Sequence, residues 1–176
     1  MMEFHIRRAR SADAPTIIAG INTVCAEGGY FYTPHYIPTP AWEAALHNPQ
    51  TVSDHLLLVA EVGKTLVGVA RLFPLPGDSE NGRVGELSIF VCPAFRGQKI
   101  GTALLQELLR QVATLEYTRV VLTVLSANQR AIRLYRKFGF VKEGRQQRDY
   151  ALIGEQEEWV MARSVQHSDF TGVNYV

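Results

Sequence analysis

Residues 87–105 contain a strand-like run, a proline, a basic turn and an amphipathic helix in direct succession, and this order restricts how this part of the chain can fold. A strand-like run stops at Pro93, and a basic, glycine-containing turn leads into an amphipathic helix near Gly101. Backbone N–H groups at a helix start are unpaired, and the helix dipole adds partial positive charge there. Arg96 and Lys99 place two full positive charges in the turn. The stretch therefore predicts a site for an anion such as a diphosphate.

The same turn can also be read as a solvated basic connection, because glycine-containing loops before helices are common. Two other phosphate-binding motifs do not fit. A Walker A loop requires GxxxxGK[ST], and the dinucleotide fingerprint requires GxGxxG with an acidic residue about 20 positions later. The sequence contains neither motif, so nucleoside triphosphate chemistry is not expected.

The rest of the chain has the periodicities of alternating strands and helices. Gly63 and Lys64 separate two strand-like runs in the manner of a type II′ hairpin, and residues 27–40, with three prolines and two glycines, predict an irregular loop. The expected strands are 4–10, 55–62, 65–73, 83–91, 119–125, 140–143, 147–153 and 157–162, and the expected helices are 11–25, 41–47, 101–116 and 129–138. The element order is written with seven strands, βααβββαβαββ, in which the short run 140–143 is counted together with 147–153, and it belongs to the α/β (α+β) class.

Length and composition set the expected number of domains. With 176 residues, 47% of them apolar and 20% charged, the chain fits one globular domain, which we place at residues 1–163, with a tail at 164–176. Cys25 and Cys92 have no CxxC spacing and follow no apolar leader, so a cytoplasmic setting without a metal site is expected. No apolar run approaches the ~20 residues that span a bilayer. A net charge of +1 gives no general attraction for nucleic acid.

Two segments resemble the motifs of the GNAT superfamily of N-acetyltransferases. Residues 96–101, RGQKIG, resemble the family's Gln/Arg-x-x-Gly-x-Gly/Ala motif. Residues 128–140, NQRAIRLYRKFGF, resemble its Asn-x-x-Ala-x-x-Leu-Tyr-x-x-x-Gly-Phe segment. Lys99 stands where the family usually has its first glycine. The likeness extends over about residues 3–163 and implies the GNAT acyltransferase fold, a mixed central sheet of six to seven strands flanked by about four helices.

The resemblance implies an enzyme that transfers the acetyl group of acetyl-CoA directly to a primary amine. Ile89 and Val91 would offer backbone groups to the pantetheine arm, although ordinary strand pairing is the alternative. Asn128 would contact the same arm, and it also suits the N-cap of the helix that follows. The residues that the resemblance assigns to acetyl-CoA are Ile89, Phe90, Val91, Arg96, Gly97, Gln98, Lys99, Ile100, Gly101, Thr102 and Asn128.

Two side chains are the candidate proton donors and acceptors. Tyr135 lies two helical turns after Asn128, hence on the same face, and would protonate the departing thiolate as the general acid. A core tyrosine with a hydrogen bond is the alternative. Glu86 is the candidate base, because an ammonium with a pKa of about 10.4 must lose a proton before it attacks; a solvated carboxylate is the alternative. Cys92 is expected to be a small spacer rather than a nucleophile.

The expected acceptor is a small-molecule amine. A protein N-terminus or lysine is a second possibility, and a non-catalytic CoA-binding module is a third. The aromatic residues of the predicted loop at 27–40 could surround a cationic amine or pack the loop against the sheet. These residues are Tyr30, Phe31, Tyr32, His35 and Tyr36. Asp149, Tyr150 and Trp159 could line the opposite wall. A narrow pocket would favour a small acceptor, and an open groove would favour a protein. Family habit makes a homodimer plausible.

Overall fold

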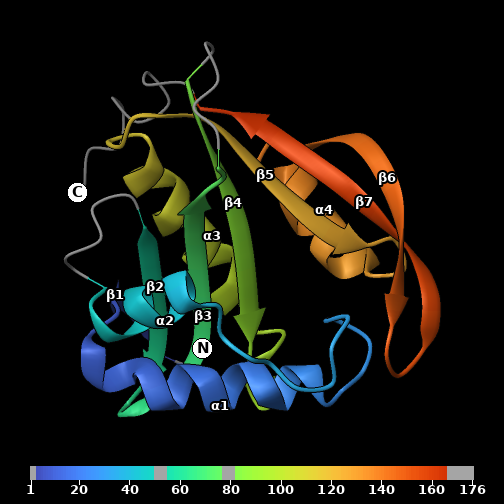
Figure 1. Ribbon diagram of the computed structural model, residues 1–176. Helices are drawn as coiled ribbons and strands as arrows, with labels where there is room; N and C mark the ends of the chain where they lie inside the picture. The colour runs from blue at the N-terminus through green and yellow to red at the C-terminus, as the bar shows by residue number, and fades with distance from the viewer. Residues whose placement is uncertain (1–2, 50–54, 77–81, 166–176) are drawn as a thin grey trace.

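A seven-stranded sheet in the order β1-β2-β3-β4-β5-β7-β6 forms the centre of the computed structural model, which describes residues 3–49, 55–76 and 82–165 (Figure 1). Its strands are β1 (His5–Arg8), β2 (Leu56–Val62), β3 (Thr65–Pro74), β4 (Arg83–Val91), β5 (Tyr117–Leu125), β6 (Val141–Tyr150) and β7 (Gly154–Ser164). The helices are α1 (Ala14–Cys25), α2 (Pro40–His47), α3 (Ile100–Val112) and α4 (Gln129–Lys137), with short 3-10 turns at Ser11–Asp13 and Pro93–Phe95. The element order and the mixed α/β class predicted from the sequence are confirmed.

Helices cover both faces of the sheet and create two apolar cores. Helix α3 and the buried side of α4 pack on one face, where Leu56 and Leu58 of β2 point. Helices α1 and α2 pack on the other face, where Leu57 and Val59 point. Because β2 is buried on both faces from residue 56 to residue 60, its sequence there is continuously apolar rather than alternating.

Strands β4 and β5 are paired over the first half of their length and diverge after it. They are the parallel pair of the sheet, and their pairing ends at Glu86 opposite Val121. Strand β4 nevertheless continues to Val91, while β5 continues to Leu125 and keeps its pairing with β7. Figure 1 shows the two strands diverging toward their C-terminal ends, where α1 and the loop after it lie. The splayed ends leave backbone groups and side chains facing an open space.

Glycine positions confirm two local predictions. Gly63 has a φ of 60° between β2 and β3, while Lys64 has no positive φ, as the type II′ hairpin requires. Gly139 has a φ of 80° just after α4, the left-handed conformation that commonly ends helices.

The boundaries near the C-terminus differ from the prediction. The segments 140–143 and 147–153 are one strand, β6, with an irregularity between Lys142 and Gly144. Because β6 is an edge strand with mostly exposed residues, its charged centre does not interrupt it. Helix α3 ends at Val112 rather than at residue 116, and β7 includes Ser164 of the predicted tail. Residues 166–176 of that tail lie outside the described residues. No helix in the described ranges is long and apolar enough to cross a membrane.

Candidate functional site

A cavity of ≈ 440 Å³ lies between the splayed ends of β4 and β5. Its walls come from these two strands, the turn before α3, the first turn of α3, one side of α4, and the end of α1 with the loop after it. The predicted site residues on its wall are Ile89, Phe90, Val91, Arg96, Gly97, Lys99, Ile100, Gly101, Thr102, Asn128 and Tyr135. Two predicted residues, Gln98 and Glu86, do not line it. The fold thus gathers both sequence motifs around one space.

The start of α3 presents free backbone donors to this cavity. The first hydrogen bond of the helix runs from the Ala103 N–H to the Lys99 carbonyl oxygen, at 3.0 Å. The N–H groups of Ile100, Gly101 and Thr102 therefore have no partner inside the helix. No acidic side chain stands in the first turn to neutralise the helix dipole. Free N–H donors in this arrangement, the α3 cradle, suit an anion, and that they bind one stays a prediction.

Lys99 adopts a backbone conformation that suits glycine. Its φ is 64° and its ψ is 5°, and no other non-glycine residue in the described ranges has a positive φ. For an L-residue this left-handed conformation costs roughly 1–2 kcal/mol. The departure from the family motif is therefore accommodated by strain, and the exposed Lys99 side chain sits on the cavity wall. Residues held in such sparsely populated conformations cluster at functional sites.

Replacing Lys99 by glycine and by alanine separates strain from charge. Both variants lose the cation, so both are expected to bind acetyl-CoA about 3- to 10-fold more weakly. Lys99→Gly also removes the strain, whereas Lys99→Ala keeps it, so the glycine variant is expected to be more stable than the alanine variant by about 1 kcal/mol. Titration calorimetry and urea unfolding measure the two effects. Equal stabilities of the two variants would contradict the strain.

The Arg96 side chain is engaged with the loop after α1 rather than free for an anion. Its two terminal nitrogens each donate to Glu27, at 2.6 Å, and its Nε donates to the Val91 carbonyl oxygen at 3.0 Å. The guanidinium also lies 4.7 Å from the centre of the Tyr30 ring. Hydrogen bonding to Glu27 raises the pKa of Arg96. We expected this side chain to supply free charge to a diphosphate. In the structure it instead joins the loop after α1 to the turn before α3.

Arg130 is a cation of the site that the sequence reading missed. It lies in the first turn of α4 and lines the cavity, and its guanidinium is 3.9 Å from where a Cβ on Gly97 would stand. The first turn of α4 has no acidic residue. A cation at a helix N-terminus is unfavourable unless an anion binds beside it. The basic first turn of α4 could therefore have indicated an anion site from the sequence alone.

Asn128 and Tyr135 share the cavity wall, as their spacing predicts. The Asn128 Oδ1 accepts a hydrogen bond from the Ala131 N–H at 3.2 Å, so the residue does cap α4. Tyr135 is only 7% exposed, and burial raises the pKa of its phenol, which therefore keeps its proton at neutral pH. Its ring packs on Phe140, and no group in the described ranges hydrogen-bonds the hydroxyl. A buried phenol without a protein partner is available to a ligand.

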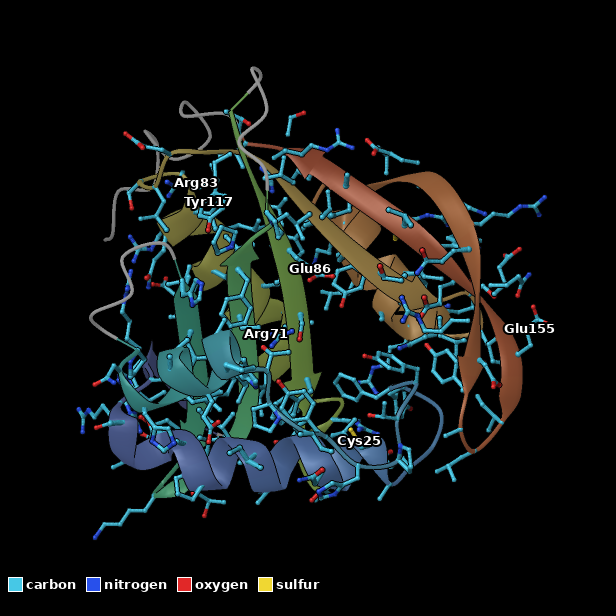
Figure 2. All side chains as sticks on the ribbon, in the orientation of Figure 1. Cys25, Arg71, Arg83, Glu86, Tyr117 and Glu155 are labelled. Atoms are coloured by element: carbon cyan, nitrogen blue, oxygen red, sulfur yellow. The ribbon has the colours of Figure 1, made fainter. Side chains whose placement is uncertain are left out.

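Glu86, Phe90 and Cys92 lie on or near β4 in different surroundings. Glu86 is exposed on the face of the sheet that α1 and α2 cover, one strand from Arg71 (Figure 2). The Phe90 ring packs into that core, 3.1 Å from where a Cβ on Gly20 would stand, although the residue also contributes to the cavity wall. Burial raises the pKa of the Cys92 thiol, the opposite of what a nucleophile requires.

The loop after α1 forms part of the cavity wall and is fixed on two sides. Tyr30 and Phe31 line the cavity, while Tyr32 reaches the last hairpin. The Ala151 N–H donates to the Tyr32 carbonyl oxygen at 3.0 Å, and the Arg148 guanidinium lies 4.7 Å from the centre of the Tyr32 ring. With the clamp from Arg96 on the other side, the loop bridges the turn before α3 and the β6–β7 hairpin. His35 is exposed and takes no part in the wall.

The last hairpin holds a buried polar cluster centred on Glu158. This carboxylate is 5% exposed and accepts hydrogen bonds from the Tyr150 hydroxyl at 2.9 Å, from Gln146 at 2.7 Å and from Arg148 at 3.0 Å. Tyr150 is thus a buried partner of Glu158 and does not line the cavity, and neither does Trp159. In the described ranges, no group of three His, Cys, Asp or Glu side chains could hold a metal ion.

Comparisons with known proteins agree with this geometry. The sequence model described as the acetyltransferase (GNAT) family matches residues 25–140. The chain is 34% identical over 127 residues to the N-alpha-acetyltransferase RimI of Mycobacterium tuberculosis, which covers 68% of this chain and 73% of that protein. It is 37% identical over 83 residues to a spermine/spermidine N(1)-acetyltransferase of Bacillus subtilis, covering 45% of this chain and 55% of the relative.

Solved structures have the same fold. An acetyltransferase of the GNAT family from Streptococcus pneumoniae superposes with a TM-score of 0.81 at 25% identity, covering 93% of this chain and all (100%) of that one. A phosphinothricin acetyltransferase from Sinorhizobium meliloti, solved in complex with acetyl-CoA, superposes with a TM-score of 0.79 at 23% identity, covering 99% and 94% of the two chains.

Proposed function

The chain belongs to the acetyltransferase (GNAT) family, and from that premise we propose that it transfers the acetyl group of acetyl-CoA to the primary amine of a small molecule. The observation that carries the proposal is the meeting of the α3 cradle, the splayed strand β4 and Tyr135 around one cavity. We place the activity in a single domain at residues 1–163, in a cytoplasmic setting.

The residues at the cavity suit the parts of acetyl-CoA. The diphosphate would meet the N–H groups of Ile100, Gly101 and Thr102, with Lys99 and Arg130 as nearby cations. The pantetheine arm would run along the part of β4 that β5 no longer pairs, where Ile89 and Val91 lie. Acetyl-CoA supplies the thioester that is transferred. No metal is needed for this chemistry.

Tyr135 is the proposed general acid. When the amine attacks the thioester carbonyl, the C–S bond breaks and the sulfur leaves as a thiolate that must take up a proton. The Tyr135 phenol is buried, protonated and without a protein partner, so it can donate that proton at the cavity wall. The enzyme needs no covalent intermediate, consistent with a Cys92 thiol whose pKa is raised.

The attachment of the loop after α1 to the last hairpin supports a small acceptor rather than a protein. A protein segment would need an open groove between the loop after α1 and the last hairpin. That passage is bridged by the Ala151–Tyr32 hydrogen bond and by Leu152, whose side chain is 3.0 Å from where a Cβ on Gly28 would stand. These two contacts favour a compact acceptor over an extended protein segment. A homodimer stays a prediction.

Glu86→Gln tests the proposed base. Glu86 is off the cavity wall, so it would act through water, and its loss is expected to lower kcat/KM by about 10-fold at pH 7. The defect is expected to shrink as the pH rises, because more of the acceptor is already the free amine. Steady-state rates from pH 6 to 10, with Glu107→Gln as the control on α3, measure this. A pH–rate profile identical to that of the wild type would remove Glu86 from the mechanism.

A turnover screen tests the proposed function as a whole. Free thiol release from acetyl-CoA is followed with small amines, amino acids, polyamines and short peptides as acceptors. We expect turnover with a small amine and little with peptides. Turnover with peptides alone would favour the protein acceptor, and binding of acetyl-CoA without turnover on any acceptor would favour the non-catalytic module.

A further inference from the structure

Arg71 is a buried cation that the proposed chemistry does not use. It lies on β3 directly opposite Ser88 of β4, on the face that α1 and α2 cover. Its guanidinium stands 4.6 Å from the centres of the Trp42 and Phe73 rings. Within the described residues, no carboxylate comes within ion-pair distance of it. The two aromatic rings hold the charge in place without neutralising it.

Two buried N–H donors, one on Arg71 and one on Trp42, have no hydrogen-bond acceptor in the described ranges. They are the Arg71 Nε and the Trp42 Nε1. Leaving such donors unpaired costs about 1–3 kcal/mol each, and more where the group is charged. Two unpaired donors from different elements that line one small cavity are the pattern expected where a ligand oxygen or a water molecule binds.

The space in front of these donors adjoins the larger cavity. A small cavity of ≈ 30 Å³ is lined by Trp42, Arg71 and Tyr36 among others. It shares Phe31, Ser88 and Phe90 with the cavity of the proposed active site. A volume of this size holds one or two oxygen atoms rather than a whole ligand. It is therefore suited to one polar group of a molecule whose remainder occupies the larger cavity.

Charges around Arg71 favour an anion in that space. Burial lowers the pKa of Arg71, yet an arginine remains protonated in proteins, so the buried positive charge persists. The Tyr36 hydroxyl interacts with the guanidinium, and the carboxylate that acts on Arg71 is that of Glu86, which lies on the neighbouring strand and is exposed to solvent (Figure 2). A cationic polyamine placed here would meet a like charge at short range, whereas a carboxylate would pair with it.

We propose that Arg71 and Trp42 bind the carboxylate of the acceptor, which makes the acceptor an amino acid with a free carboxyl group close to the amine. This inference rests on the proposed function. The carboxylate occupies the small cavity, and the amine points past Ser88 toward the larger one. The acceptor ammonium first loses one proton through water, and the free amine nitrogen then forms the new N–C bond. As the C–S bond breaks, the nitrogen loses a second proton to solvent and the thiolate takes up one proton from Tyr135. The carboxylate itself is unchanged, so Arg71 is a specificity residue.

Matched acceptors test the inference on the wild-type protein. Each common amino acid is compared with its own α-amide and with the amine that lacks the carboxyl group, and kcat/KM is expressed per free amine because the three differ in amine pKa. We expect the acids to be preferred by about 10- to 100-fold, the range expected for hydrogen bonds to a charged group. Amides or simple amines that react as fast as the acids would overturn the inference.

Substitution of Arg71 assigns that preference to a residue. Arg71→Gln is expected to raise KM for the acid at least 10-fold, with KM for the amide and for acetyl-CoA unchanged. Arg71→Lys keeps the charge without the planar fork and should retain part of the preference. Arg110→Gln, on the outer surface of α3, is the matched control and should behave as wild type. If a folded Arg71→Gln variant still preferred the acid over the amide as strongly as wild type does, Arg71 would be excluded as the group that binds the carboxylate.

The two proposals fail in different ways. Acetylation of peptides, polyamines or amides in preference to acids would leave the acetyltransferase function standing and overturn the role of Arg71. Absence of thiol release with every acceptor would overturn both. If Arg71→Gln does not fold, the comparison of acids with amides on the wild-type protein decides by itself.

Discussion

Replacing Tyr135 with phenylalanine is expected to lower kcat by about 100-fold or more, which is the usual contribution of a positioned general acid. The affinity for acetyl-CoA should not change. The phenol lines the cavity, is 7% exposed and has no hydrogen-bond partner in the described ranges, so its removal deprives the thiolate of a proton donor without breaking a protein contact. Single-turnover rates and calorimetry with acetyl-CoA measure the two quantities.

Tyr117→Phe is the matched control for this substitution. Tyr117 is also a buried tyrosine, at the start of β5, and it does not line the cavity. Its replacement should leave kcat within about twofold of wild type, whatever it does to stability, because its hydroxyl is not at the cavity; a twofold change corresponds to about 0.4 kcal/mol in activation free energy. A Tyr135→Phe enzyme that turns over as fast as the control would show that Tyr135 is a core residue only.

Placing an aspartate at Thr102 is expected to weaken acetyl-CoA binding by about 100-fold while the protein keeps or gains stability. An acidic residue in the first turn of a helix interacts favourably with the dipole, by about 0.3–1 kcal/mol. The same carboxylate would stand on the cavity wall beside the N–H groups that are proposed to hold the diphosphate. Repulsion between like charges at about 6 Å costs about 2–3 kcal/mol at an effective dielectric constant of 20.

Thr102→Asn provides the uncharged comparison. It has the shape of aspartate without the charge, so it should bind acetyl-CoA within about fivefold of wild type, a difference of about 1 kcal/mol. Thermal unfolding and titration calorimetry on all three proteins separate the two effects. If Thr102→Asp bound acetyl-CoA as well as Thr102→Asn does, the diphosphate would not lie at the start of α3.

Local sequence patterns were enough to predict most of the fold. Helical spacing, the proline after β4 and the glycines at 63 and 139 each act over a few residues, and each has its counterpart in the structure, although α3 ends at Val112, before the predicted residue 116. Strand β6 was divided wrongly because charged residues usually interrupt a strand, whereas an edge strand tolerates them. Whether a strand lies at an edge is decided by pairing between distant segments.

The candidate site was predictable where one motif supplies it. The backbone cradle at the start of α3 and the pair Asn128 and Tyr135 follow from short segments. The engagement of Arg96 with Glu27 joins residues 69 positions apart, and no local pattern signals it. Arg71 was missed for a similar reason, because only the packing of α2 and β3 shows that its charge is buried between two aromatic rings.

Calorimetric titration with acetyl-CoA and with S-acetylpantetheine tests the central claim most directly. The two compounds carry the same thioester, but the second has no diphosphate and no nucleotide. If the free N–H groups at the start of α3 hold the diphosphate, acetyl-CoA will bind at least 100-fold more tightly than the truncated compound, a difference of about 2.8 kcal/mol. Equal affinities, or no heat from acetyl-CoA at millimolar concentration, would contradict the account.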